Sequence, residues 1–542
     1  MRNWRINLIF ALIFLFGAVV IGRLFYLQII KGDYYRALAQ GQQRIFQALG
    51  KERGEIFFHG GQILATNIKG NYLFASPSEI KNKEEAAEKI SSILKLDKNI
   101  VLEKLNKDTF LEPLKLDPTS EEEKLIKNLN LTGLYFKEGI FRKYPQGEMA
   151  SQTIGFLGGE EVGQYGLEGY YDDILQGLDG GEKSDKGSDI ILTLDYNIQF
   201  MAEKLLKEAK ENLKIEGGQI VVLEPNSGKV LALASFPNFD PNYYFDAEDF
   251  KIFQNSATQK FFEPGSIFKP ITMAGALDQG RITPQTTYVD EGEVKIGGYT
   301  IYNYGKKVWG ERTMTEVLEN SINTGAVFVE RKLGSNLFLE YIEKFGLFEP
   351  TGIDLQGEVF SENKEFKKGY EINFATVSFG QGIEITPLQM ARAFCAIANG
   401  GKMVKPYTVE KIVNYDKTKE IQPQISPEQV ISLNAASKLT AMLVGVVENG
   451  FGKKAKIPGY YIAGKTGTAQ VPWSALGVKK KGYSETTWQS FIGFAPAFSP
   501  KFLILVKLDN PQTNTAESSA VPIFKELAKY IIDYLEIPPD YE

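Results

Sequence analysis

The sequence predicts a protein with one N-terminal membrane anchor, followed by a part of mixed α/β architecture that lies outside the membrane. Its 542 residues suffice for two to four domains of roughly 150 residues each. Residues 6–22 form a nearly uninterrupted apolar run, and from residue 190 onward strand-like and helix-like segments follow one another. We therefore expect an anchor, a smaller domain and a larger α/β domain.

The apolar run has the length of one bilayer crossing, because roughly 20 residues span the hydrocarbon core. Arg2 and Arg5 precede the run, and no small-x-small cleavage site follows it. We therefore expect residues 6–30 to be an uncleaved transmembrane signal anchor rather than a cleaved signal peptide. The positive-inside rule then keeps residues 1–5 in the cytoplasm and places the bulk of the chain outside the cytoplasmic membrane.

The segment at residues 31–188 is predicted to form the smaller domain. Lys83–Leu105 has apolar residues at helical spacing with charges between them, which predicts two short surface helices. Thr119–Lys124 predicts the start of another helix, with an N-cap and glutamates in its first turn. The glycine-rich residues 177–187 are typical of a linker, so the boundary is placed after residue 188.

The larger domain is predicted to occupy residues 189–542. Its first elements set the α/β pattern, since a strand and a helix precede a hairpin across a Pro-Asn-Ser-Gly turn. The expected bounds are Ile190–Leu194 for the strand, Ile198–Leu213 for the helix, and Gly218–Leu223 with Lys229–Ser235 for the hairpin.

Composition excludes several classes of function. The net charge of −6 gives no basic excess that would indicate a nucleic-acid partner. The single cysteine, Cys395, rules out an internal disulfide, and the single histidine, His59, rules out any site that needs two imidazoles. We expect Cys395 to be a buried core thiol and His59 to lie in a surface turn. Any catalytic groups must then come from Ser, Lys, Asp, Glu or Tyr side chains or from the backbone.

Serine followed three residues later by lysine is a candidate nucleophile with its base, because the two side chains share one helix face. Only Ser266 follows a Pro-Gly turn and opens an apolar, helix-like stretch. For Lys269 to act as a base, its pKa must fall well below ~10.4, so we expect burial and a second lysine nearby. The Ser-x-x-Lys pattern occurs four times in the chain, at Ser78/Lys81, Ser92/Lys95, Ser266/Lys269 and Ser361/Lys364.

Two further motifs complete a possible site. Ser-x-Asn occurs at Ser321–Asn323 and in two other places, whereas Lys-Thr-Gly occurs once, at Lys465–Gly467, and Thr468 follows it. An edge strand with this sequence would supply a cation, hydroxyls and N–H groups for a carboxylate and an oxyanion. The three motifs, in this order, form the active-site set of the penicillin-recognising serine acyl-enzymes.

With these motifs the sequence resembles the class B penicillin-binding proteins, the monofunctional peptidoglycan D,D-transpeptidases. It is more similar to the division type (FtsI-like, with its sporulation relatives) than to the elongation type. The chain departs from the family pattern at Phe58–Gly61, where Asp-Arg-Asn-Gly is usual, and at Ser256, where arginine is common. Further matching motifs are Arg53–Ile56, Arg142 with Tyr144–Pro145, Gly166–Gly169, Glu263–Ser266, Ser378–Gly382 and Ser490–Phe494.

The resemblance implies a pedestal (dimerisation) domain at residues 31–188. It also implies a transpeptidase domain at residues 189–542, in which helices flank an antiparallel sheet and a helical subdomain is added. The implied location is the bacterial cytoplasmic membrane, crossed once with the N-terminus inside. Its implied partners are stem peptides that end in D-Ala-D-Ala, an amine acceptor, β-lactam inhibitors, a polytopic glycan polymerase and other cell-wall or division proteins. No metal or organic cofactor is implied.

The resemblance also implies a role for each motif residue. Lys269 takes the proton of Ser266, which attacks the penultimate D-Ala carbonyl, and Ser321 relays the proton to the leaving group. The backbone N–H groups of Ser266 and Thr468 form the oxyanion hole. The implied substrate-binding residues are Asn323 for the amide, and Lys465, Thr466 and Thr468 for the terminal carboxylate, together with Gly467 of the same motif.

Two other functions are compatible with the motifs. A serine β-lactamase or a β-lactam sensor shares them, although a pedestal of over 100 residues would serve no hydrolase. A different kind of function is that of a scaffold in the division complex, which would be recruited through residues 6–30 and for which catalysis would be secondary. The fate of an acyl-enzyme distinguishes a transpeptidase from a hydrolase.

Overall fold

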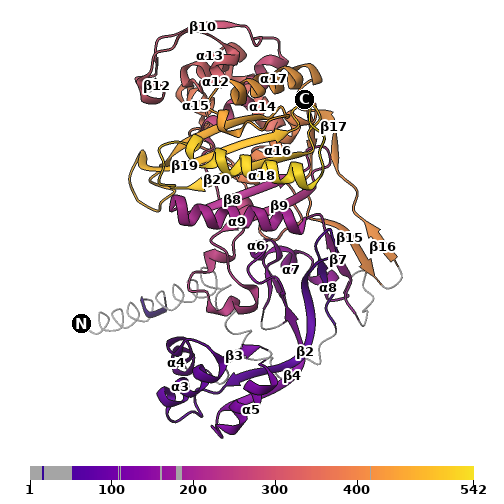
Figure 1. Cartoon of the computed structure of the whole chain (residues 1–542). Helices are drawn as coiled ribbons and strands as arrows, with labels where there is room; N and C mark the ends of the chain where they lie inside the picture. The colour runs from indigo at the N-terminus through magenta and orange to yellow at the C-terminus, as the bar shows by residue number, and fades with distance from the viewer. Residues whose placement is uncertain are drawn as a thin grey trace, which may run out of the picture.

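The computed structural model describes residues 15–17, 52–107, 109, 112–116, 118–158, 161–178, 186–414 and 417–542. An elongated N-terminal part lies below a larger part that contains a five-stranded sheet (Figure 1). Most of the anchor predicted at residues 6–30 lies outside the described residues, as does the middle of the predicted linker. Within the described residues, no helix has the length and apolar character that a membrane crossing requires.

A long antiparallel ribbon forms the lower end of the N-terminal part. In this ribbon β2 (Ile63–Ala75) pairs with β4 (Leu134–Lys143) and with β3 (Glu112–Leu116). Three helices pack on it around a core that includes Leu73, Ile90 and Leu105. The two predicted surface helices and the third helix, capped by Thr119, are confirmed, as α3 (Lys83–Leu94), α4 (Lys98–Asn106) and α5 (Ser120–Asn128).

The upper end of the N-terminal part is organised around one buried carboxylate. Glu168 is fully buried and accepts hydrogen bonds from Arg53 Nε and Arg142 Nε, both 2.7 Å long. Burial alone would raise the pKa of Glu168, but the two guanidinium groups hold it below its usual range. The short elements here are β5 (Phe156–Leu157), β6 (Gly163–Gln164), α6 (Ser151–Ile154), α7 (Gly166–Tyr170) and α8 (Asp172–Leu175).

A seven-stranded sheet connects this end to distant parts of the chain, and it includes β2, β3 and β4 because β2 also pairs with β1 (Ile56–Phe57). The predicted strand after residue 188 is confirmed as β7 (Asp189–Leu192), which pairs in parallel with β1 and antiparallel with β15 (Val409–Asn414). Beyond β15 lies β16 (Lys417–Glu420). The strand that begins the predicted larger domain therefore pairs with both halves of the chain.

The larger part is built on a five-stranded antiparallel sheet in the order β18-β19-β20-β8-β9. The predicted hairpin is confirmed as β8 (Gly217–Leu223) and β9 (Val230–Phe236), and the predicted helix as α9 (Tyr196–Leu213). The remaining strands are β18 (Ala463–Pro472), β19 (Tyr483–Ala495) and β20 (Phe502–Asp509). The strand that carries Lys-Thr-Gly therefore lies at the sheet edge, as expected.

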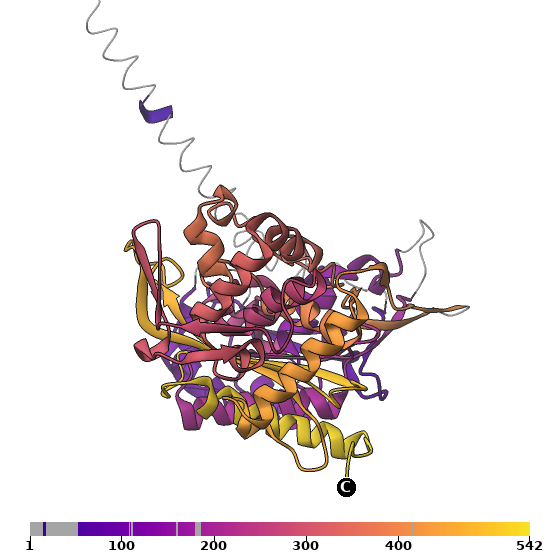
Figure 2. The ribbon, with the colours of Figure 1, turned by 90° about the horizontal axis from the view of Figure 1, so that it is seen from above.

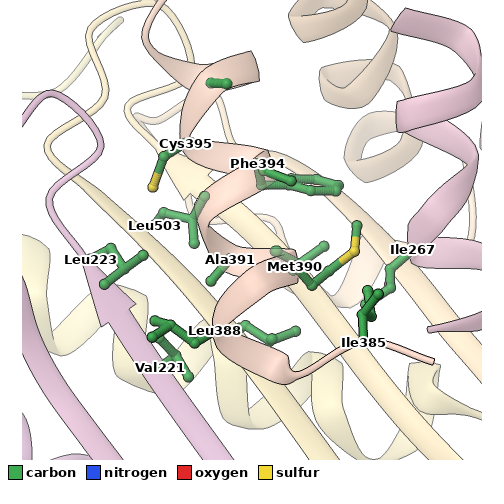
Figure 3. Packing of buried hydrophobic residues seen from close by; sticks show 14 of the residues in the cluster. Val221, Leu223, Ile267, Ile385, Leu388, Met390, Ala391, Phe394, Cys395 and Leu503 are labelled. Atoms are coloured by element: carbon green, nitrogen blue, oxygen red, sulfur yellow. The ribbon is translucent and has the colours of Figure 1, made fainter. Parts of the chain in front are cut away.

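Helices cover both faces of this sheet, because its strands are apolar on both sides. On one face α9 packs beside α18 (Ala520–Tyr534), and on the other α16 (Pro387–Ala398) packs beneath the helical subdomain. Figure 3 shows side chains of α16 in contact with those of the sheet. Cys395 is among these side chains and is fully buried, which confirms the prediction of a core thiol.

A helical subdomain lies above the sheet, as the expected fold class requires (Figures 1 and 2). Pairs of short strands form two-stranded sheets in this region, and the subdomain together with the five-stranded sheet encloses the motif residues. Its helices are α11 (Lys269–Asp278), α12 (Met314–Glu319), α13 (Asn323–Leu333), α14 (Ser335–Lys344), α15 (Glu371–Val377) and α17 (Leu433–Glu448). The other elements are α10 (Ser256–Gln259), β10 (Thr287–Asp290), β11 (Glu293–Ile296), β12 (Tyr299–Tyr302), β13 (Gly310–Thr313), β14 (Lys402–Val404) and β17 (Ile425–Gln429).

Candidate active site

Ser266 lies in the 3₁₀ turn η5 (Gly265–Phe268), directly before α11. Ser266 therefore opens the helical segment, as expected, but the first turn of that segment is 3₁₀ rather than α. Pro270 has no N–H to donate to the carbonyl of Ser266, and the N–H of Lys269 donates to it instead, which tightens the turn. Ser266 and Lys269 still face each other, because residues three apart eclipse in a 3₁₀ turn.

Two glycines allow the turn and the edge strand to approach closely. Gly265 has φ +57° and donates from its N–H to the carbonyl of Gly380, 2.9 Å away. A Cβ on Gly467 would lie 2.5 Å from Ser490 Oγ and 3.0 Å from the carbonyl oxygen of Pro264. Gly467 is therefore required for packing β18 against η5.

The amine of Lys269 is the centre of the site. Its side chain is fully buried, and Nζ lies 3.0 Å from Ser266 Oγ. Nζ also donates to the carbonyl of Ser321 at 2.6 Å and to Asn323 Oδ1 at 2.9 Å. Burial, together with the charge of Lys465, holds the pKa of Lys269 well below its usual value. The predicted burial and second lysine are thus confirmed.

Ser321 joins the two lysines. Its Oγ accepts from Lys269 Nζ at 3.3 Å and from Lys465 Nζ at 2.9 Å. Ser321 has φ +52°, a left-handed conformation that costs energy for a residue with a side chain and that often marks a functional site. With this backbone, both its carbonyl and its hydroxyl reach Lys269.

Lys465 lies on β18 and is fully buried. Burial lowers its pKa to about 7. Thr466, also buried, and the half-buried Thr468 follow it on the same edge strand. The structure therefore brings Ser266, Lys269, Ser321, Asn323 and Lys465 into one hydrogen-bonded cluster, with Thr466, Gly467 and Thr468 alongside it on β18.

Comparison with known families identifies this arrangement. The family model for the penicillin binding protein transpeptidase domain matches residues 218–529, and that for the penicillin-binding protein dimerisation domain matches residues 49–189. The chain belongs to the penicillin-binding protein transpeptidases. Because a dimerisation domain precedes the transpeptidase domain, it is a class B penicillin-binding protein and a serine-type transpeptidase.

Individual relatives of this penicillin-binding protein cover nearly the whole chain. It is 32% identical over 569 residues to stage V sporulation protein D of Bacillus subtilis, covering 99% of this chain and 86% of that protein. It is 28% identical to penicillin-binding protein PbpB of Mycobacterium tuberculosis, covering 97% of this chain and 84% of that protein. The crystal structure of penicillin binding protein 3 from M. tuberculosis, complexed with ampicillin, matches with a TM-score of 0.72 at 27% identity, covering 91% of this chain and 97% of that chain.

Two residues of this transpeptidase that support the site were missed by sequence reasoning. Asn303 Oδ1 accepts from the backbone N–H groups of Asn323 and Thr324, at 3.0 and 3.1 Å. The buried carboxylate of Asp290 in turn accepts from the amide of Asn303 at 2.9 Å. They lie in the hairpin region before α12 without a recognisable motif, so only the folded structure reveals their contact with Asn323.

The two singleton residues lie away from the penicillin-binding site. His59 is exposed in a turn, where its Nδ1 lies 2.9 Å from a carboxylate oxygen of Glu410, which confirms the expected surface position. Cys395 lies in the core, where burial raises the pKa of its thiol. Within the described ranges, no group of three or more His, Cys, Asp or Glu residues could hold a metal ion.

The pKa values of the two lysines predict how acylation of this penicillin-binding protein depends on pH. If Lys269 is the base, as the resemblance implies, it accepts a proton only when neutral, so acylation should fall as pH drops through its lowered pKa. If Lys465 holds the carboxylate, it does so only when charged, so the rate for carboxylate-bearing substrates should also fall above about pH 7. An uncharged thioester should lack this alkaline fall. Acylation rate constants measured for both substrates from pH 5 to pH 9 test the prediction, which identical profiles would contradict.

Proposed function

We propose that this chain cross-links peptidoglycan stem peptides through an acyl-enzyme on Ser266. The observation that carries the proposal is the 3.0 Å contact between Ser266 Oγ and the buried amine of Lys269. A neutral Lys269 takes the proton as Oγ bonds to the penultimate D-Ala carbonyl carbon. The carbon–nitrogen bond to the terminal D-Ala then breaks, and Ser321 relays the proton to the departing amine. A second stem peptide's amine attacks the ester carbon, the bond from that carbon to Ser266 Oγ breaks, and the proton that the amine loses returns to Oγ through Lys269.

The remaining motif residues hold the donor peptide in this mechanism. The backbone N–H groups of Ser266 and Thr468 stabilise the oxyanion, which develops as the tetrahedral intermediate forms. Lys465, Thr466 and Thr468 hold the terminal carboxylate, while Gly467 keeps the strand close to the turn. Asn323 fixes the substrate amide. The proximity of Lys269, Ser321 and Lys465 supports this division of roles.

A donor and acceptor assay tests the transferase activity. The full chain is incubated with a D-Ala thioester donor and a D-amino acid acceptor, and products are separated by mass. We expect the transfer product to increase with acceptor concentration and to vanish in Ser266→Ala. Hydrolysis alone at every acceptor concentration would contradict the proposed transpeptidation.

We also propose a septal role and a single-pass membrane topology. Residues 1–5 lie in the cytoplasm, 6–30 span the bacterial cytoplasmic membrane, 31–188 form the pedestal and 189–542 form the transpeptidase domain. The basic residues Arg2 and Arg5 support this orientation. The similarity to a sporulation protein supports the division-type role, and the family resemblance implies action beside a polytopic glycan polymerase and other division proteins.

Protease added to intact spheroplasts should therefore remove nearly all of the chain's mass, because the pedestal and the transpeptidase domain face outward. Immunoblotting against a C-terminal tag measures the loss. A cytoplasmic protein serves as the control for membrane integrity. Protection of the tag while the control also stays intact would contradict the topology.

A further inference from the structure

The hydroxyl of Thr468 has its hydrogen bonding set by a distant loop. Its Oγ1 accepts a hydrogen bond from the backbone N–H of Ala516, 3.2 Å away. A hydroxyl that already accepts from an N–H group retains its own proton for another acceptor. Thr468 is therefore prepared as a donor, which is the role that a substrate carboxylate requires.

The loop that carries Ala516 is fastened to the sheet by one amide. Ala516 begins η9 (Ala516–Ser518), between β20 and α18. Gln489 on β19 is fully buried and is the cross-strand partner of Thr468. Its Nε2 donates to the carbonyl of Thr513 at 2.6 Å, and its Oε1 accepts from Thr513 Oγ1 at 2.8 Å and Ser519 Oγ at 2.5 Å. Thr513 and Ser519 flank Ala516, so these bonds fix both sides of the N–H donor.

The amide of Gln489 has no hydrogen-bonding capacity left over. Its second N–H donates to Thr487 Oγ1 at 3.1 Å, so two donors and two acceptor positions are filled. The carbonyl of Thr513 can only accept, which determines the orientation of the amide. A buried polar group bound in this way positions its partners, because loss of the amide would leave several of them unpaired.

We propose that Gln489 is a positioning residue for the carboxylate-binding part of the active site. Through Thr513 and Ser519 it holds the loop at residues 513–519 so that the Ala516 N–H keeps the Thr468 hydroxyl directed at the terminal carboxylate of the donor. Gln489 itself touches no reacting atom. The inference rests on the proposed function of the Lys-Thr-Gly-Thr strand.

Acylation of Gln489→Leu in the full chain tests the inference. Rate constants are measured with a β-lactam that carries a carboxylate and with an uncharged thioester. We expect a loss of roughly tenfold for the β-lactam, as for one hydrogen bond to a charged group, and a loss below about threefold for the thioester. The matched control is Thr487→Val, which removes a bond to the same amide without releasing the loop and should stay near wild type.

A second pair of variants keeps the test decisive if Gln489→Leu does not fold. Thr513→Val removes the loop hydroxyl that Gln489 accepts from, and should show the same selective loss, while Thr513→Ser keeps the hydroxyl and should restore the rate. If Gln489 had a purely structural role, the acylation rate constants for both substrates would fall equally, and that result would overturn the inference.

The Thr468→Val variant distinguishes a failure of this inference from a failure of the proposed carboxylate-binding function on which it rests. If it is selective against the β-lactam, and if adding Gln489→Leu causes no further loss, the two residues act through one another. If Thr468→Val is selective but Gln489→Leu is not, only the inference is overturned. If Thr468→Val lowers both rates equally, the proposed carboxylate site fails and the inference fails with it.

Discussion

Replacing Lys269 by alanine is expected to lower acylation by every substrate, by roughly 10²–10⁴-fold, because positioned general bases contribute this much. The amine lies 3.0 Å from Ser266 Oγ, and burial with the charge of Lys465 keeps it available in the neutral form. The measurement is the acylation rate constant of the variant with a carboxylate-bearing β-lactam and with an uncharged thioester. Both rates should fall by similar factors.

Lys465→Ala is the matched comparison for this prediction. Lys465 donates a hydrogen bond to Ser321, and in the proposed mechanism it anchors the carboxylate. The acylation rate constant should therefore fall much more for the β-lactam than for the thioester. Removing the charge of Lys465 also removes a repulsion that lowers the pKa of Lys269, so the remaining thioester activity should shift to higher pH. Equal losses for both substrates with both variants would refute the division of labour between the lysines.

Penicillin is expected to form a long-lived adduct with this chain, because among the described residues no carboxylate is hydrogen-bonded to Lys269 that could activate water against the ester. The hydrogen bonds of Lys269 among the described residues go to Ser266, Ser321 and Asn323, none of which has a carboxylate. Glu263 is a buried carboxylate close to Ser266 in sequence, and burial raises its pKa to about 7. However, it accepts a hydrogen bond from Tyr483 at 3.0 Å, so it is already engaged elsewhere.

Intact-mass spectrometry after prolonged incubation should therefore show one drug per chain. A serine β-lactamase run in parallel provides the control, since it returns to the free mass once the drug is consumed. Rapid return of this chain to its free mass would favour the hydrolase that shares these motifs.

Local sequence patterns predicted many elements correctly, because their causes are local. The capped helix after Thr119 and the hairpin of β8 and β9 follow from side-chain caps, turn residues and periodicity. The helical start at Ser266 was predicted, but the 3₁₀ character of its first turn was not, because Pro270 changes the hydrogen bonding and leaves the hydrophobic pattern the same.

Long-range contacts account for what could not be predicted. The strand β7 is recognisable from its sequence, but its pairing with β1 and β15 depends on residues more than 100 positions away. The motif residues were found because their order resembles a known family. Asp290, Asn303 and Gln489 belong to no such motif. Their roles could not be predicted, because they follow from hydrogen-bond partners that only the folded structure reveals.

The central claim is that Ser266 is the nucleophile, and mapping a labelled peptide tests it most directly. The full chain is treated with a reporter β-lactam, digested and sequenced by mass spectrometry, with Ser266→Ala treated in the same way. We expect the label on the peptide that contains Ser266 in the wild type, and no label in the variant. A label on a different serine, or one that persists in Ser266→Ala, would contradict the assignment.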